Sequence, residues 1–159
     1  MKGPGFFLVF LALSTTAFAF NQPAELKGIK TVNVMIADLS DDLISDGVDK
    51  EALRTTLELA LTTAGIAVLS RDQFDDTVPT IALRVSEIKE PNGRFYAATV
   101  ALACLDNVSN SRILGPFSAA IWARDELLLL GKVDLSRVAS GEKQLVDLFL
   151  NDYKAANPG

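Results

Sequence analysis

Acidic side chains form the densest group of residues in this chain that could do chemistry. The segment DLSDDLISDGVDKE, from Asp38 to Glu51, holds five aspartates and one glutamate around a single glycine. Carboxylates gathered in this way are typical ligands of calcium, which takes about six to eight oxygen atoms in its protein sites. The segment therefore has to be compared with the calcium-binding loop.

The calcium-binding loop requires an oxygen ligand at its first, third, fifth and last positions and a glycine at its sixth. With Asp42 in first place, Asp46 and Gly47 fall correctly on the fifth and sixth positions. Ile44 then falls on the third position and Leu53 on the twelfth, where oxygen is needed. The sequence thus predicts no metal-binding site here and leaves open only weak, adventitious binding of a divalent ion.

The same acidic residues have a simpler structural role. Negative charge is favourable at the positive end of a helix dipole, which accounts for Asp49 and Glu51 at the start of an expected helix. Asp38, Asp41 and Asp42 are typical of a solvated turn after a strand. We therefore expect the segment to be structural.

Nucleophilic and acid-base chemistry have few candidates. The chain has no histidine, which excludes a Ser-His-Asp triad, a Cys-His pair and any zinc site with histidine ligands. The one cysteine, Cys104, lies in the apolar run VALACLD and is expected to be an inert core thiol. Adjacent acids, Asp75 with Asp76 and Asp125 with Glu126, are more typical of solvated positions than of catalysis. The sequence predicts a protein that is not an enzyme, without catalytic, cofactor-binding or metal-binding residues.

The first twenty residues have the order of a secretory signal. Lys2 is followed by the apolar run from Phe6 to Leu13. In the AFA that ends this segment, Ala17 and Ala19 are the small residues at the minus-three and minus-one positions of a cleavage site. A membrane-spanning helix needs about 20 apolar residues, so no integral membrane span is expected after removal of the signal. The sequence predicts a signal peptide over residues 1–19, a single α/β domain over residues 20–159, and a periplasmic or secreted protein.

The overall negative charge argues against nucleic acid as a partner. The chain has 15 basic and 20 acidic residues, a formal net charge of −5, and no basic stripe with interleaved aromatic residues. Such a protein is repelled by phosphate backbones, so we expect no nucleic-acid binding. A lone cysteine also forms no disulfide within the chain, so stability has to come from the core.

The elements of the first half follow from hydrophobic periodicity. KTVNVMIADL alternates apolar and polar residues, which predicts a strand. The following helix has Asp49 as its N-cap and Gly65 just past its end. IAVLS, from Ile66, predicts a second strand, which a right-handed crossover places parallel to the first.

The second half changes to an antiparallel pattern. TIALRVSEI predicts a strand and EPNGR a tight turn. Two more strands are expected at Phe95–Leu105 and from about Phe117 to Arg124, joined by the polar turn DNVSNSR. The fold class expected is α/β (α+β), a two-layer sandwich with a mixed four- or five-stranded sheet and two helices on one face, in the order β-α-β-β-β-β-α.

A second helix is expected at the end of the chain. Asp134 is placed to cap it, it runs to about Ala156, and Leu148 is among the side chains expected on its inner side. Gly141 weakens this helix by about 1 kcal/mol relative to alanine and is a candidate for a bend.

The closing LVDLFLNDYKAANPG, together with AGIAVLS and the EPNGR hairpin, resembles a family of small exported bacterial proteins without an assigned activity. The order of elements is also similar to envelope modules, namely the TolB amino-terminal domain and the LptE-like and curli-secretion lipoproteins. The lipoproteins carry a lipid-attachment cysteine that is missing at the predicted cleavage point here. The resemblance implies an envelope protein but transfers no site residue, because a shared fold does not determine function.

Two strands carry more apolar residues than one covered face explains. FYAATVALACL has one clearly polar member, Thr99, and FSAAIWA has only Ser118, whereas a strand with one wet face should alternate. Two helices cover one face, so either the Phe95, Ala97, Ala101 set or the Tyr96, Ala98, Leu102 set is left without a cover. The candidate interaction residues are Phe95, Tyr96, Phe117, Trp122, Leu127, Leu128, Leu129 and Leu130.

This excess leads to one function hypothesis and two alternatives. The first is a non-enzymatic exported accessory module of the bacterial cell envelope that acts by protein association, with an envelope protein or as a homodimer. The second is a carrier of a small apolar ligand such as a lipid, held between helices and sheet. A carboxylate enzyme comes third. Exposed alanines and a buried core tryptophan at Trp122 would explain the same residues without any partner.

Overall fold

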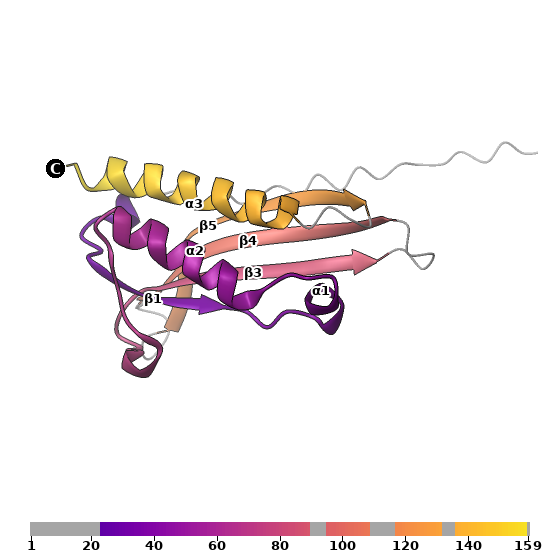
Figure 1. Ribbon diagram of the computed structural model, residues 1–159. Coiled ribbons are helices and arrows are strands. Elements are labelled where there is room, and N and C mark those ends of the chain that lie inside the picture. The colour runs from indigo at the N-terminus through magenta and orange to yellow at the C-terminus, as the bar shows by residue number, and fades with distance from the viewer. Residues whose placement is uncertain (1–22, 90–94, 109–116, 132–135, 159) are drawn as a thin grey trace, which may run out of the picture.

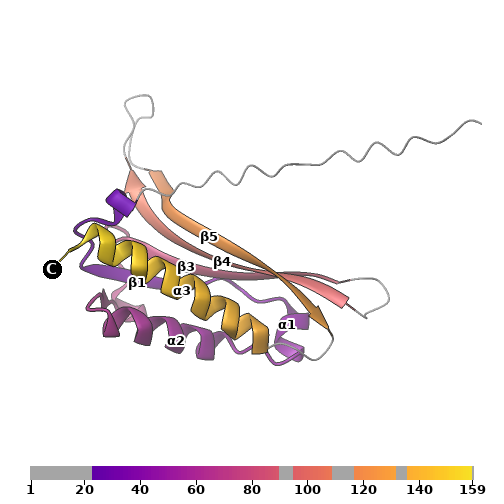
Figure 2. The same ribbon diagram turned by 90° about the horizontal axis from the view of Figure 1, so that it is seen from above.

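The computed structural model describes residues 23–89, 95–108, 117–131 and 136–158. Five strands form one mixed sheet in the order β2-β1-β3-β4-β5, and helices α2 and α3 pack on one of its faces (Figure 1, Figure 2). The predicted fold class is confirmed. The elements are β1 Thr31–Ile36, α1 Asp41–Ser45, α2 Lys50–Thr63, β2 Ala67–Val68, β3 Thr80–Lys89, β4 Phe95–Val108, β5 Phe117–Gly131 and α3 Ser136–Ala156, with 3-10 turns η1 Pro23–Leu26 and η2 Arg71–Gln73.

Strand β1 lies inside the sheet and is parallel to both of its neighbours. It pairs with β2 through Thr31 and with β3 along Asn33 to Ile36. Val32 and Val34 are buried under the helices, as their alternation predicts. The parallel β1-α2-β2 crossover expected from the sequence is confirmed.

Helix α2 begins and ends as its sequence predicts. The Asp49 side chain accepts hydrogen bonds from the backbone N–H of Glu51 (2.8 Å) and Ala52 (3.3 Å), which satisfies two free donors of the first turn. Gly65 follows the last turn with φ +85°, a conformation that favours glycine. The buried side of the helix consists of leucines at helical spacing, Leu53, Leu57 and Leu61.

The acidic segment before α2 is more ordered than the solvated turn that the sequence predicts. Asp41 and Asp42 open the short helix α1, whose N-cap is Ser40. The Ser40 hydroxyl accepts from the backbone N–H of Leu43 (3.2 Å), and Leu43 is buried. The expectation of a turn was wrong because one inward leucine and a capping serine are enough to hold a single helical turn against the core.

The antiparallel meander β3-β4-β5 is confirmed, but its last strand is longer than predicted. β5 continues past Arg124 to Gly131 and pairs with β4 over this whole length, so that Leu127 to Leu130 belong to the strand. One register shift interrupts the pairing, between Cys104 and Leu105. Consecutive leucines hide the alternation from which a strand is predicted.

For helix α3, the expected burial of Leu148 and the expected bend at Gly141 were wrong, and the expected cap is not tested. Leu148 is 42% exposed, whereas Val146 takes the buried position. The helix runs without interruption through Gly141, and a Cβ there would lie 3.2 Å from Glu126 Oε2 and 3.3 Å from Leu128 Cδ1. The glycine therefore allows α3 to approach the sheet closely. The predicted cap, Asp134, lies outside the described residues.

Trp122 and Phe149 form the centre of the core between β5 and α3. Their rings meet edge to face at 5.2 Å, and the indole N–H of Trp122 donates to Asp152 Oδ2 (2.9 Å). The edge-to-face contact and the satisfied N–H account for a fully buried tryptophan.

The two ends of the described chain are bonded to each other. The Asn157 side chain accepts from the backbone N–H of Gly28 (2.7 Å) and donates to the carbonyl of Leu26 (3.0 Å). The Tyr153 hydroxyl donates to the carbonyl of Ile29 (2.8 Å). The end of α3 and the segment around η1 are thus held side by side.

Candidate interaction surface

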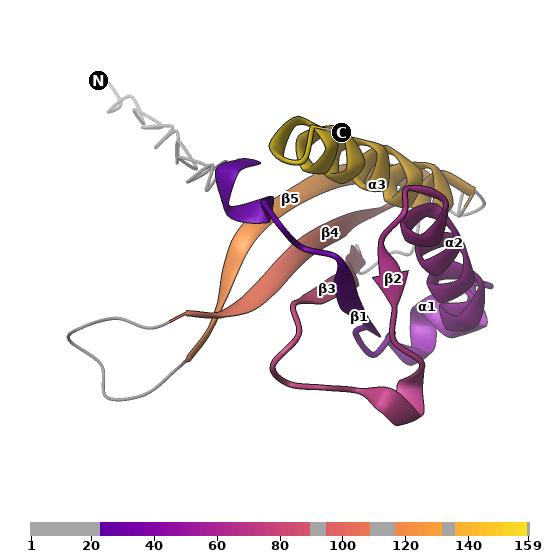
Figure 3. The same ribbon diagram turned by 90° about the vertical axis from the view of Figure 1, so that its left-hand side faces the viewer.

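The face of the sheet opposite the helices is the candidate surface, and we call it the open face (Figure 3). Within the described ranges no helix covers it. Its centre consists of three rows of side chains that run across β3, β4 and β5, and all of these side chains are partly or fully exposed. The rows are Ala82, Ala103 and Ala123; Arg84, Ala101 and Asp125; and Ser86, Thr99 and Leu127.

Two opposite charges lie on either side of an alanine in the middle row. Arg84 pairs with Ala101 of β4, and Ala101 pairs with Asp125 of β5. Because neighbouring strands are about 4.8 Å apart, the backbones at Arg84 and Asp125 are roughly 10 Å apart. Both side chains are exposed, and neither forms an ion pair with another described residue.

A loop closes one end of the open face. Asn33 lies there on β1 and is buried, because residues 70–79 pass over it. Its side-chain amide donates to the carbonyls of Asp75 (2.7 Å) and Val78 (3.0 Å). Near the other side of the loop, Asn107 donates to the carbonyl of Asp76 (2.5 Å). The described residues therefore cover the end of this face but not its three central rows.

The outer edge of β5 is also unoccupied by any described strand. β5 is the last strand in the sheet order, and it pairs with β4 on one side only. The free backbone groups of an edge strand are a template for pairing with another chain. The edge and the open face meet at Leu127, whose side chain is 64% exposed.

The predicted interaction residues whose side chains the structure describes do not form a single patch. Trp122 and Leu128 are buried in the core on the helix side, Phe117 is half-buried, and Leu127 lies on the open face. The side chains of Phe95, Tyr96, Leu129 and Leu130 lie outside what the structure describes, although their backbones pair within β4 and β5.

The sequence left open which β4 set is uncovered, and the structure decides it. Ala98 and Leu102 are buried under the helices, whereas Ala97 and Ala101 are partly exposed on the other side. Arg84 and Asp125 were missed as members of the site. They become neighbours of Ala101 only through the strand register, which no local pattern reveals.

The acidic segment is accounted for by contacts within the chain. Asp38 Oδ1 lies 2.7 Å from Lys50 Nζ, and this hydrogen bond together with the lysine charge lowers the pKa of Asp38 below its usual value. Ser40 donates to Glu87 Oε1 (2.9 Å), while Asp49 caps α2. In the described part of the chain, no three His, Cys, Asp or Glu side chains are grouped so that they could hold a metal ion.

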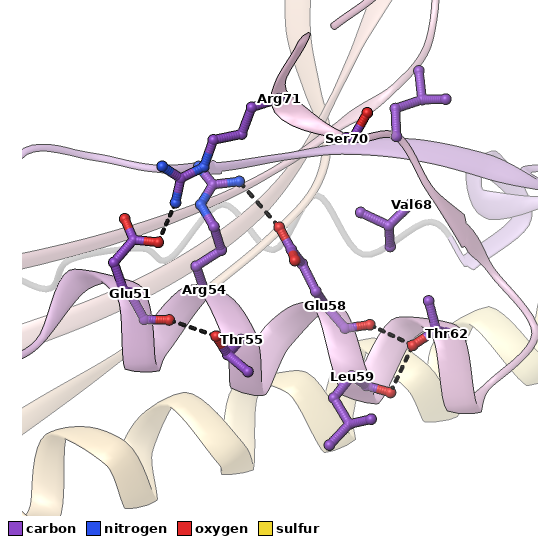
Figure 4. Close-up of a pocket in the computed structure, with 10 residues that line it drawn as sticks. Glu51, Arg54, Thr55, Glu58, Leu59, Thr62, Val68, Ser70 and Arg71 are labelled. Atoms are coloured by element: carbon purple, nitrogen blue, oxygen red, sulfur yellow. Dashed lines mark hydrogen bonds and ion pairs between the residues drawn. The ribbon is translucent and has the colours of Figure 1, made fainter. Parts of the chain in front are cut away.

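A charged cleft of about 580 Å³ lies between α2 and the segment from β2 to Arg71 (Figure 4). Two arginines line it, and each is paired with a glutamate of the same cleft. Arg71 pairs with Glu51, and Arg54 Nη1 lies 3.1 Å from Glu58 Oε1 while it also donates to the carbonyl of Val34 (2.9 Å). The charges compensate each other, so the cleft offers little attraction to an anionic ligand.

Cys104 and the adjacent acids are placed unfavourably for catalysis. Burial, with a smaller effect from the Asp106 charge, raises the pKa of the Cys104 thiol to about 12, which keeps it protonated. Hydrogen bonds from Thr77 lower the pKa of Asp75. Asp125 and Glu126 point to opposite faces of β5, because successive strand residues alternate.

Glu142 is the one fully buried carboxylic acid in the described ranges. It lies on α3, is 1% exposed, and its Oε1 has no hydrogen-bond partner among the described residues. Burial raises its pKa to about 7. The side chain is enclosed beneath the helix and is not accessible to a substrate.

An apolar groove of about 550 Å³ separates the outer sides of α2 and α3. Ala52, Leu59, Ala60 and Val146 contribute its apolar lining, and the charged Lys143 and Asp147 also line it. The groove lies between the two helices, whereas the ligand site expected from the sequence was between helices and sheet. Of the described helices, none is long and apolar enough to cross a membrane.

No protein-family model matches this chain, and no curated protein matches it. The resemblance to a family of small exported proteins therefore stays a prediction. Among solved structures, the chain is similar to a minor lipoprotein from Acinetobacter baumannii, with 15% sequence identity, coverage of 81% of this chain and 93% of the other, and a TM-score of 0.33. It is also similar to a PelC variant from Paraburkholderia phytofirmans, described as a dodecamer, with 17% identity, coverage of 80% and 89%, and a TM-score of 0.44.

Proposed function

We propose that this protein is a non-enzymatic accessory module of the bacterial cell envelope that acts by protein association through the open face. The observation that carries the proposal is the composition of that face. Its central strand presents Thr99, Ala101 and Ala103, which are small and only partly exposed. An antiparallel sheet with one wet face usually carries polar side chains there.

Small side chains suit a surface that another protein covers. Alanine leaves little side-chain bulk above the strand, so a second surface can approach closely and gain dispersion contacts with the backbone as well. Four alanines and Leu127 also give the face an apolar part, and exposed apolar surface is typical of interaction sites. The charges at Arg84 and Asp125 and the exposed Leu127 would then provide orientation and an anchor.

Export and the absence of catalysis are parts of the same proposal. The predicted signal peptide, residues 1–19, lies outside the described residues and supports an envelope location through its sequence alone. The protonated thiol of Cys104 and the enclosed carboxyl of Glu142 favour structural roles for both groups.

The test is whether association depends on the open face. Ala101→Arg introduces a long charged side chain into the centre of the face, and Ala155→Arg makes the same change on an exposed turn of α3. We expect crosslinked species and self-association, measured by equilibrium sedimentation across micromolar concentrations, to be lost in the first variant and kept in the second.

Circular dichroism melts check that both variants fold. A wild-type chain that stays monomeric and gives no crosslink sensitive to Ala101→Arg would contradict the proposal.

The apolar groove between α2 and α3 favours one alternative, a carrier of a lipid or other acyl chain. Its lining by Ala52, Leu59, Ala60 and Val146 has the apolar character that such a ligand needs. Native mass spectrometry of protein purified from its own host should then show added mass, and Ala60→Glu should remove it. Protein of bare mass would contradict this alternative and leave the association proposal untouched.

A further inference from the structure

We infer that the occupant of the open face is a second copy of this chain, related to the first by a two-fold axis parallel to β4. In this arrangement Arg84 of each copy lies opposite Asp125 of the other. The inference rests on the proposed function and goes beyond it by naming the partner and the geometry.

The charge pattern of the face is self-complementary about one axis. Arg84 and Asp125 lie on opposite sides of Ala101, one strand away in each direction. A two-fold axis along β4, in the plane between two stacked sheets, exchanges the β3 side of one copy with the β5 side of the other. Each arginine then meets an aspartate, and the two contacts are identical, as a two-fold interface requires.

The other in-plane axis gives the opposite result. A two-fold axis perpendicular to the strands and along this row would place β3 over β3, so that Arg84 faces Arg84 and Asp125 faces Asp125. Like charges brought together in this way are destabilising. The face thus distinguishes between the two ways of stacking sheets, and a self-complementary surface of this kind fits a second copy of the chain.

The rows on either side are compatible with this stacking. Ala82, Ala103 and Ala123 form a row without charge, and Ser86, Thr99 and Leu127 form a row in which only the leucine is large. Stacked sheets lie about 10 Å apart, and an arginine that faces an aspartate can span this distance. The small Ala101 between Arg84 and Asp125 allows the two sheets to approach closely enough for both charged pairs to form.

The experiment uses charge reversal in the full exported chain. Arg84→Asp turns both intermolecular contacts into pairs of carboxylates, and Asp125→Arg turns both into pairs of guanidinium groups. Each single variant should raise the dissociation constant of the dimer by at least about 100-fold in equilibrium sedimentation. The matched controls, Lys154→Asp and Asp147→Arg, make the same charge changes on exposed positions of α3 and should leave the dimer intact.

Mixing provides the decisive result. The two single variants are complementary to each other, because both contacts in a mixed dimer join opposite charges. We expect an equimolar mixture of the two monomeric variants to form a one-to-one dimer, and the double variant Arg84→Asp with Asp125→Arg to dimerise alone. Raising the ionic strength should weaken the wild-type dimer.

The outcomes separate this inference from the proposed function. A wild-type dimer that neither reversal weakens would overturn the two-fold stacking and leave association, for example through the β5 edge, in place. A monomeric chain with a crosslinked envelope partner that is lost in Ala101→Arg would do the same. If the reversals lower only the melting temperature and never the association, the two charges act within one chain, which overturns the inference.

A monomer without any open-face crosslink would overturn both the inference and the proposed function.

Discussion

On β4, Val100 and Leu102 lie on the side of α3 and are fully buried, whereas Ala101 and Ala103, their direct neighbours in the chain, lie on the open face and are partly exposed. Both sets are apolar. What differs at these four positions is the size of the side chain. Val100 and Leu102 are branched and fill space beneath α3, whereas Ala101 and Ala103 are small.

This difference shows which property separates the two faces of the sheet. Polarity, the usual indicator of an exposed face, does not distinguish these four residues. Their size does, because a core is packed as densely as a crystal and needs side-chain volume. The substitutions below test this contrast in order of decreasing effect.

The largest effect should come from removing the same side chain on opposite faces. Leu102 is 0% exposed and Leu127 is 64% exposed, so Leu→Ala leaves a cavity at the first position only. We expect Leu102→Ala to lower the free energy of unfolding by about 2–5 kcal/mol and Leu127→Ala to change it by less than about 0.5 kcal/mol. Urea unfolding at a concentration where the chain is monomeric measures both.

Equal losses at the two positions would mean that the open face is as closely packed as the covered one.

The second effect concerns a charge enclosed on the covered side. Burial raises the pKa of Glu142 from 4.5 to about 7. Between these two pH values the Glu142 carboxyl is protonated in the folded chain and ionised in the unfolded chain. This group leaves stability unchanged below about pH 4.5 and lowers it progressively as the pH rises to about 7. Glu142→Gln should therefore raise the free energy of unfolding by roughly 2 kcal/mol at pH 8 and leave it unchanged at pH 4.

Glu25→Gln, at an exposed position, is the matched control and should change the free energy of unfolding by less than about 0.5 kcal/mol. A Glu142→Gln variant with the same difference from wild type at both pH values would contradict the assignment of the buried proton.

The smallest effect tests how closely α3 approaches the covered face. Gly141→Val places methyl groups against Leu128 and Glu126, whose atoms already lie 3.2–3.3 Å from a Cβ at this position. We expect a loss of about 1–2 kcal/mol from overpacking, measured by thermal unfolding. Ala139→Val, on an exposed turn of the same helix, should cost only a few tenths of a kcal/mol through helix propensity.

If the two valines cost the same, the close approach at Gly141 does not limit the packing.

Much of the fold could be predicted from local sequence features. The Asp49 cap, the position of Gly65 just past the end of α2 and the alternation in β1 each depend on a few residues, and the structure confirms all three. The end of β5 and the exposure of Leu148 could not be predicted in the same way. Consecutive leucines carry no period, and the angle at which a helix rests on a sheet decides which of two neighbouring residues is buried.

The candidate site was harder to predict because it depends on register. The sequence identified an uncovered sheet face but placed its contacts on the large residues, including Trp122 and Leu128, which lie in the core. Arg84 and Asp125 stand on two strands that do not pair with each other, and only the pairing of both with Ala101 brings them into one row. Long-range pairing of this kind is a property of the folded sheet.

The side chain of Asn157 binds the backbone of Leu26 and Gly28, so the described chain closes into a ring of contacts. Chains whose ends meet in this way tolerate being joined there and opened elsewhere. A circular permutant opened within an existing turn should therefore form the same sheet. The arrangement of the elements in space would then not depend on their order along the gene.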